Sequence, residues 1–220
     1  MKIDIRTVPV RWINLDSATA NAEAVSRDLD EAKFTNHSRF PAIVTDPADP
    51  LCVSDHPHMK PYLVGCGKSH IACIEESLGR GPFLVLEDDA AVTKAFYPII
   101  NIPPDTDAVY LGSSTGNPNT MVADANGYFV RIGKMLAAHA VLYISDRYKQ
   151  AVLDVAKKFV YELHHPWDIA PSTVQEHFNV LASRVPFFIQ SDARTSEHKW
   201  EFFTKHKLVT RSSQFERQWP

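Results

Sequence analysis

Short apolar runs alternate with longer amphipathic segments through much of the chain. The clearest run is residues 83–86, four large apolar side chains that follow two glycines and lead directly into three acidic residues. A run this short and uniformly apolar is typical of a strand buried on both faces of a parallel sheet. Comparable runs predict strands at residues 8–15, 40–44, 108–112, 127–132, 139–144 and 186–190.

Between these runs, apolar residues recur at the three- and four-residue spacing of helices. This spacing predicts helical segments at residues 17–33, 65–78 and 147–163, and an amphipathic segment at 93–100. We also expect a helix from Pro171 to about Arg184, because Ser172 and Gln175 have the spacing of a capping box. Strands alternating with helices predict an α/β fold, with a mainly parallel, Rossmann-like sheet flanked by helices.

Length and composition fit an ordinary globular chain. Of the 220 residues, 45% are hydrophobic and 22% are charged, and a net charge of -3 provides no global field to recruit nucleic acid. The N-terminus lacks the apolar core of a signal peptide, and the three cysteines fit a reducing compartment, so we expect a cytoplasmic protein. We expect one domain over residues 1–192 and a basic, aromatic extension over 193–220, suited to contact an acceptor or a membrane surface.

The acidic residues Glu87, Asp88 and Asp89 follow the central strand directly. The carboxyl ends of parallel strands are where open α/β sheets bind ligands. Three carboxylates packed together repel, which favours a bound divalent cation, Mn²⁺ or Mg²⁺. We expect Asp89 to bind this cation most directly, with Glu87 assisting. The alternative is that one aspartate caps a helix beginning at Ala90.

A second polar segment, Gly65-Cys66-Gly67-Lys68-Ser69-His70, contains part of a nucleotide-binding P-loop pattern. That pattern requires a glycine at position 62, where the chain has tyrosine, so the sequence excludes a P-loop. The remaining interpretations are a glycine-rich turn whose backbone N–H groups meet an anion at a helix start, and a plain turn capped by Ser69.

Several of these segments resemble glycosyltransferase family 25, which includes bacterial lipopolysaccharide galactosyltransferases and the procollagen galactosyltransferase domain. The resemblance is carried by Ile13-Asn14-Leu15-Asp16, by Gly65-Cys66 with Ser69-His70, and by Leu84 to Asp89, in the family's order. Weaker matches occur at residues 109–112, at 139–145, at Asp168, and at Pro186 with Gln190.

The resemblance implies a GT-A-like fold, a nucleotide-sugar donor (most often UDP-linked), a divalent metal, and inversion at the anomeric carbon. The acceptor would be a glycan, such as a lipopolysaccharide, or another hydroxyl compound. The residues implied in donor binding are Asn14, Leu15, Asp16, Gly65, Ser69, His70, Glu87 and Asp88.

An inverting transfer needs a base that removes the proton of the acceptor hydroxyl. Asp168 is our candidate, because it lies just past a predicted helix and stands apart in sequence from the acidic triplet. Trp167 beside it is suited to stack on an acceptor sugar. The alternatives are that Asp168 caps a turn before the next helix, and that His164 or His165 is the base.

Two other functions use the same residues. A metal-dependent phosphohydrolase or nucleotidyltransferase would place the acidic triplet around a phosphate substrate. An inactive relative would bind a nucleotide or glycan without turnover, although intact Glu87, Asp88 and Asp89 argue against a decayed site.

Overall fold

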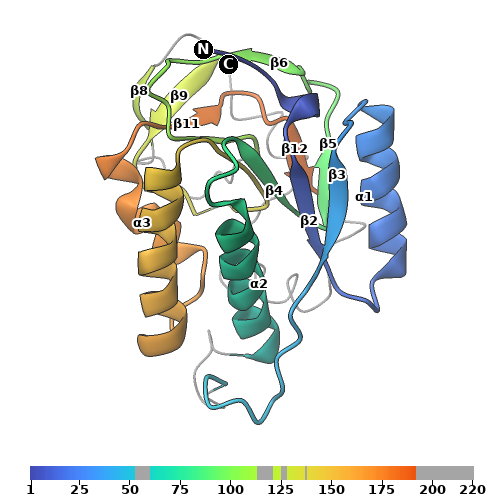
Figure 1. Ribbon diagram of the computed structural model, residues 1–220, viewed down its shortest axis with the longest axis vertical. Coiled ribbons are helices and arrows are strands. Elements are labelled where there is room, and N and C mark those ends of the chain that lie inside the picture. Colours follow the sequence, from blue (N-terminus) through green and yellow to red (C-terminus); the bar gives the residue numbers. More distant parts are fainter. Residues whose placement is uncertain (53–59, 113–120, 125–127, 137, 192–220) are drawn as a thin grey trace.

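The computed structural model describes residues 1–52, 60–112, 121–124, 128–136 and 138–191 (Figure 1). The helices are α1 (Thr19–Glu31), α2 (Pro61–Ser77), α3 (Asp146–Lys157) and α4 (Ile169–Val174). The strands are β1 (Lys2–Asp4), β2 (Val10–Asn14), β3 (His37–Pro41), β4 (Phe83–Glu87), β5 (Ala90–Val92), β6 (Ile99–Asn101), β7 (Ala108–Tyr110), β8 (Met121–Asp124), β9 (Phe129–Ile132), β10 (Ala140–Tyr143), β11 (Val180–Ser183) and β12 (Phe188–Gln190).

The main sheet has eight strands in the order β3-β2-β4-β10-β7-β11-β9-β8. Strand β2 pairs in parallel with β3 and β4, and β7 pairs in parallel with β11. Strands β10 and β9 run against the others, through antiparallel pairings on both of their sides. The predicted fold class, an α/β arrangement with a mainly parallel sheet flanked by helices, is confirmed.

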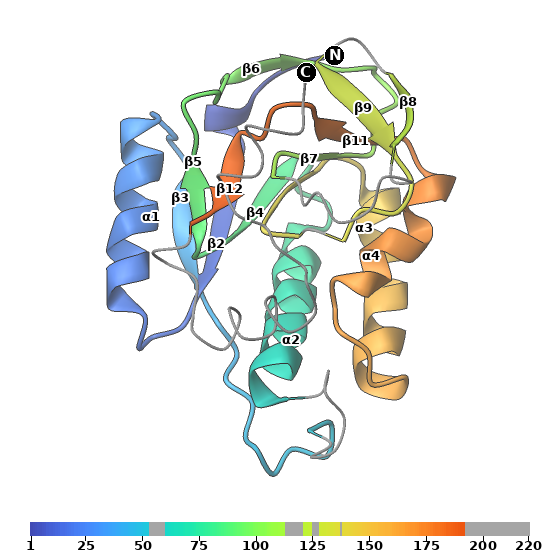
Figure 2. The same ribbon diagram turned by 180° about the vertical axis from the view of Figure 1, so that it is seen from behind.

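Strand β4 lies inside the sheet and is buried on both faces, as its apolar run predicts. Phe83 and Val85 pack on the face covered by α2 and α3, while Leu84 and Leu86 pack on the face covered by α1. All four side chains are 0% exposed, and each such burial contributes about 1.5–3 kcal/mol. Figures 1 and 2 show α1 on one side of the sheet and α2 with α3 on the other.

Helix α3 begins at an N-cap that the sequence supplies. The Ser145 hydroxyl accepts a hydrogen bond from the backbone N–H of Tyr148, and Asp146 adds a negative charge to the first turn. The helix continues into a π-helical turn over Lys158–Glu162, so the segment predicted at residues 147–163 is helical with a change of pitch near its end.

The predicted helix from Pro171 to about Arg184 is wrong over its second half. Helix α4 begins earlier, at Ile169, and the Ser172 hydroxyl donates to the carbonyl of Ile169 instead of capping the helix. Residues Val180–Ser183 form β11, a buried strand paired on both sides. The three apolar residues Val180 to Ala182 fit a strand or one helical turn equally well, and here the pairing with β7 decides.

Two other expectations change. Residues Ala90–Val92 form β5, which pairs with β12, so no helix begins at Ala90 for an aspartate to cap. The amphipathic segment at 93–100 ends in β6, which pairs antiparallel with β1. Within the described ranges, no helix is long and apolar enough to cross a membrane. The extension predicted at residues 193–220, with its expected membrane or acceptor contact, lies outside the described residues.

Candidate functional site

The carboxyl ends of β2 and β4 bring the sequence motifs together. These strands are parallel neighbours with Ile13 opposite Glu87, so Asn14 and the acidic triplet emerge at the same edge. Helix α2 runs beside this edge and brings His70 to Glu87. Three segments, near residues 14, 66–70 and 87–89, therefore meet at one place in the molecule.

Asp88 is half-buried and is oriented by side-chain amides. Asn14 donates to its Oδ2 atom at 2.9 Å, and Asn21 of α1 donates to the same atom at 3.3 Å. Arg39 of β3 fixes Asn14 in turn, because its Nε donates to the Asn14 side-chain oxygen at 2.8 Å and its Nη2 donates to the Asn14 carbonyl at 3.0 Å. Arg39 also forms an ion pair with Asp16, while the Leu15 side chain is exposed.

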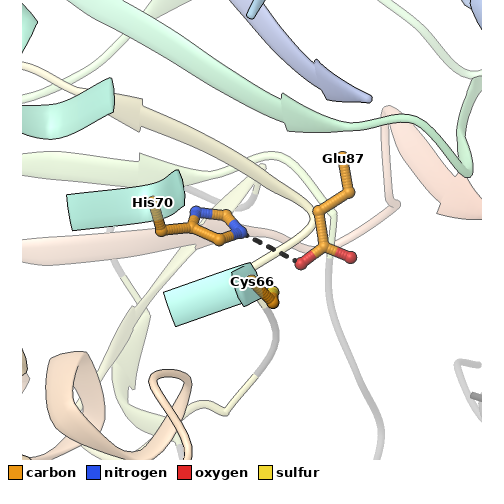
Figure 3. A group of neighbouring side chains, drawn as sticks. All are labelled: Cys66, His70 and Glu87. Carbon is orange, nitrogen blue, oxygen red and sulfur yellow. Dashed lines mark hydrogen bonds and ion pairs between the residues drawn. The ribbon is translucent and has the colours of Figure 1, made fainter. Parts of the chain in front are cut away.

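Glu87 points to the opposite side, toward α2 (Figure 3). Its Oε1 atom lies 3.2 Å from Nε2 of His70, whose side chain is 1% exposed. The His70 ring stacks on Trp167, with ring centroids 4.4 Å apart and planes 13° from parallel. The stack fixes the plane of the imidazole, so its Nε2 atom faces the carboxylate.

Asp89 is held away from this pair. It is 1% exposed, its Oδ2 atom accepts from the Gln190 side chain at 3.3 Å, and its carbonyl accepts from the N–H of Ser191 at 2.8 Å. Strand β4 ends at Glu87 and the chain turns at residues 88–89, which separates the side chains of Asp88 and Asp89 from that of Glu87. The three carboxylates thus contact three different partners, and this arrangement does not fit one Mn²⁺ or Mg²⁺ ion held by all three.

The glycine-rich segment lies inside α2 and not at its start, so the predicted anion-binding turn is wrong. A Cβ atom on Gly65 would lie 2.4 Å from the carbonyl oxygen of Ile43, and one on Gly67 would lie 3.0 Å from the side chain of Val160. The glycines therefore permit close packing on both sides of the helix. Ser69 donates to the carbonyl of Gly65 and accepts from the N–H of Ile43, which ties the helix to the segment after β3.

Asp168 lies beside the same region. It is half-buried at the N-cap position of α4, but it forms no side-chain cap hydrogen bond there, so the capping interpretation is not supported. Burial raises the pKa of the Tyr110 phenol, and the negative charge of Asp168 raises it further. Since Tyr110 is the last residue of β7, the Asp168 carboxylate lies near the end of that strand. Asp168 also follows Trp167 directly, and Trp167 contacts His70.

Some contacts were not foreseen from the sequence. Trp167 is 3% exposed and stacks on His70, so the expected stacking on an acceptor sugar is wrong. Cys66 joins His70 and Glu87, and the ligand atoms of these three residues lie within 4.8 Å of one another. The signal available in the sequence was the four-residue spacing of Cys66 and His70, which puts both side chains on one face of a helix. The exposed His165 contacts Phe159, while His164 has a positive φ of 54°.

Comparisons with known proteins give similarities of structure only. No protein-family model matches the chain, and no curated protein matches its sequence. The apo form of the glycosyltransferase GlyE of Streptococcus pneumoniae TIGR4 is 9% identical with a TM-score of 0.43, covering 79% of this chain and 45% of that one. The chain therefore spans less than half the length of GlyE.

Two further solved structures show the same range of similarity. A UDP-glucose pyrophosphorylase complexed with UDP-glucose is 8% identical with a TM-score of 0.47, and the match covers 90% of this chain and 81% of that one. A glycosyltransferase involved in glycosylation of the major capsid of PBCV-1 is 12% identical with a TM-score of 0.36, and the match covers 80% and 94% of the two chains.

Proposed function

We propose that the protein transfers a sugar from a nucleoside diphosphate donor to a hydroxyl acceptor. One observation carries this proposal: the segments on which the resemblance to glycosyltransferase family 25 rests, distant in sequence, meet at the carboxyl edge of β2 and β4. Asn14 contacts Asp88, and His70 contacts Glu87. This edge is where α/β sheets bind nucleotides.

The donor nucleotide would be held from the β2 side of the edge. An ionised carboxylate has about four acceptor positions. Asp88 accepts from Asn14 and Asn21 through its Oδ2 atom, and we assign it to the hydroxyl groups of a ribose. Arg39 supports this arrangement through Asn14 and supplies positive charge near the edge. We infer a UDP-linked donor from the family resemblance.

We infer that the transfer is a single displacement, with no covalent enzyme intermediate. The acceptor oxygen forms a bond to the anomeric carbon while the bond from that carbon to the diphosphate breaks, and the bonding electrons leave with the diphosphate. Asp168 takes the acceptor proton, and the attack inverts the configuration. Because the triplet does not fit a shared Mn²⁺ or Mg²⁺ ion, we assign it no step through that ion.

The test is Asp168→Asn, which preserves the shape of the side chain and removes its basicity. We expect kcat for nucleoside diphosphate release to fall by about a hundredfold or more, the range for loss of a general base, with donor affinity unchanged. The matched control is Asp154→Asn on the exposed side of α3. Nucleotide sugars would be screened first by thermal shift, with and without Mn²⁺, Mg²⁺ and Zn²⁺, because bound ligands raise apparent stability.

Two results would contradict the proposal. Near-normal kcat in Asp168→Asn would move the base to another residue, with His164 and His165 tested next. Pyrophosphate release from a nucleoside triphosphate and a sugar phosphate, with no turnover of any nucleotide sugar, would indicate a nucleotidyltransferase. Release of phosphate from simple phosphoesters would indicate a hydrolase.

A further inference from the structure

We propose that Cys66, His70 and Glu87 form a binding site for a thiophilic divalent cation, with Zn²⁺ as the best fit. Metal binding at this site does not depend on whether the protein transfers sugars. Any role of the bound metal in turnover rests on the proposed function. It differs from the expected Mn²⁺ or Mg²⁺ site in its ligand atoms, because a sulfur and a nitrogen replace two carboxylate oxygens.

The three ligands come from two neighbouring elements. Cys66 and His70 are four residues apart on α2, so their side chains project from the same face of the helix. Glu87 is the last residue of β4 and points toward that face (Figure 3). Among the residues that the structure describes, this is the only group of at least three His, Cys, Asp or Glu side chains found close enough to share an ion.

The distances are already near those of a bound ion. Bond lengths of about 2.0–2.3 Å to a tetrahedral zinc ion place two ligand atoms about 3.5 Å apart. The pair His70 and Glu87 stands at 3.2 Å, and all three ligand atoms lie within 4.8 Å of one another. The ligand atoms therefore need to approach one another by no more than about 1.3 Å, and we assign this approach to the side chains of Cys66 and Glu87.

The backbone around Cys66 is held on both sides. The absence of a Cβ atom at Gly65 lets α2 approach the carbonyl of Ile43, and its absence at Gly67 lets the helix approach Val160. The Trp167 ring stacks on the face of the His70 imidazole and restrains its orientation. A site built on a packed helix and a central strand keeps its geometry before the ion arrives, which lowers the cost of binding.

The polar contacts identify the ligating atom of the histidine. The Nδ1 atom of His70 is buried and has no hydrogen-bond partner in the described structure, whereas Nε2 faces Glu87. We therefore assign Nε2 as the ligand. On binding, the imidazole proton resides on Nδ1 and the Cys66 thiol releases its proton to solvent. Affinity should consequently fall as pH decreases, because protons compete for both atoms.

The choice of metal follows from the ligand types. A thiolate is a soft ligand that Mg²⁺ and Mn²⁺ bind poorly, whereas zinc accepts sulfur, nitrogen and carboxylate oxygen together. Three protein ligands are the usual set of zinc sites that keep one position open. An oxyanion, such as a donor phosphate, or a water molecule is the class of ligand that would take this position.

The experiment uses the full chain, stripped with a chelator and titrated with Co²⁺, whose thiolate complexes absorb in the near ultraviolet. We expect one Co²⁺ per chain, a sulfur-to-cobalt charge-transfer band, and displacement by Zn²⁺ but not by Mn²⁺ or Mg²⁺. Cys66→Ser should lose the band and weaken Zn²⁺ binding by about a hundredfold or more, since even supporting residues of metal sites contribute 10–100-fold. Cys52→Ser, which replaces another half-buried cysteine, should keep the band.

A second variant protects the test against misfolding of Cys66→Ser, which circular dichroism would reveal. Glu87→Gln should keep the band, because the sulfur remains, but weaken Co²⁺ binding by at least about tenfold. A wild-type protein with no band, a band that persists in Cys66→Ser, or unchanged Co²⁺ affinity in Glu87→Gln would overturn the site. Cys66, His70 and Glu87 would then form only a packing and hydrogen-bonding cluster.

Failure of this inference is distinguishable from failure of the proposed function. Nucleotide-sugar turnover that persists in the chelated protein with Mn²⁺, and without a cobalt band, would remove the thiophilic site and retain the transferase. A cobalt band without turnover of any nucleotide sugar would retain the metal site and remove the transferase.

Discussion

Buried polar groups at the two ends of the main sheet differ in whether they have hydrogen-bond partners. Near the amino ends of β4 and β7, the fully buried Lys149 donates to the carbonyls of Ser77 and Gly81 and to Asp146, and Asp107 accepts four hydrogen bonds. Near the carboxyl ends of β3 and β4, Thr45 and His70 each have a buried polar atom without a partner in the described structure, and so does Trp167, which stacks on His70.

The difference separates stability from function. Satisfied buried networks fix a fold, whereas groups left unsatisfied lower stability unless a ligand uses them. The contrast is not complete, because the hydroxyl of Tyr143 at the amino end is also buried without a partner. Substitutions at the amino end should therefore reduce stability and spare activity in the folded fraction, while substitutions at the carboxyl end should do the reverse.

The largest stability effect is expected for Asp107→Ala. The carboxylate accepts from Arg147 through Nε and Nη2, from the Ser145 hydroxyl and from the N–H of Asn179, and it is 1% exposed. Its loss removes four hydrogen bonds to a buried charged group, two of them from Arg147, so we expect the free energy of unfolding in urea to fall by about 3 kcal/mol. Asp105→Ala, at an exposed neighbouring position, is the control and should change it by less than about 0.5 kcal/mol.

The pH dependence of stability gives a second measurement of Asp107. Burial opposes ionisation, but hydrogen bonds from Arg147, Ser145 and Asn179 outweigh it and lower the pKa below the ordinary value of 3.8. A lowered folded-state pKa means that the stabilisation is complete above this ordinary value and is lost as pH falls through the folded value. Asp107→Asn should flatten the acid limb of the profile. An unchanged limb would show that the carboxylate does not carry the network.

Lys149→Met should have the next largest effect. The ammonium group joins the end of α2, the start of β4 and the first turn of α3, and its side chain is 0% exposed. Methionine fills the space but leaves two carbonyls without their donor, so we expect a loss of about 2 kcal/mol in urea unfolding. Lys157→Met removes a half-exposed surface ion pair with Glu75 and should cost less than about 1 kcal/mol. Equal losses in the two variants would contradict the assignment.

The smallest effect compares the same substitution at the two ends. Thr106 lies at the amino end of β7 and donates to the carbonyl of Pro103 at 2.8 Å, whereas the buried hydroxyl of Thr45 has no partner. Thr106→Val should therefore lose about 1 kcal/mol, and Thr45→Val should be neutral or gain up to about 1 kcal/mol. Differential scanning calorimetry would detect the opposite shifts in Tm. A loss in both variants would end the proposed contrast between the two ends.

Local composition was enough to predict β4 but not every strand of the main sheet. Phe83 to Leu86 are apolar without interruption, and few structures other than a doubly buried strand suit such a run. Residues Val180–Ser183 contain only three consecutive apolar residues, and their strand partner β7 lies about seventy residues earlier in the chain. Long-range pairing therefore decides what short local patterns leave open.

The site was predictable in position and not in detail. Strand direction alone brings Asn14 to the edge that carries Glu87 and Asp88. The directions of the carboxylates depend on the turn at residues 88–89, directly after β4, which the apolar run and the acidic triplet did not reveal. The predicted helix at residues 65–78 already gave the four-residue spacing of Cys66 and His70, but local sequence does not show that Glu87 of β4 lies against the same face of that helix.

The π-helical turn at Lys158–Glu162 has a consequence for tolerance to insertions and deletions. A π turn is equivalent to one extra residue in an α-helix, and one residue corresponds to a rotation of about 100° around the helix axis. The π turn precedes the segment that brings Trp167 against His70, and Val160 within the turn packs beside Gly67. A chain shortened by one residue within this turn would return to α-helical pitch and present the following loop, including Asp168, at nearly the same angle. The same deletion in the α-helical part, Asp146–Lys157, would rotate that loop by about 100°.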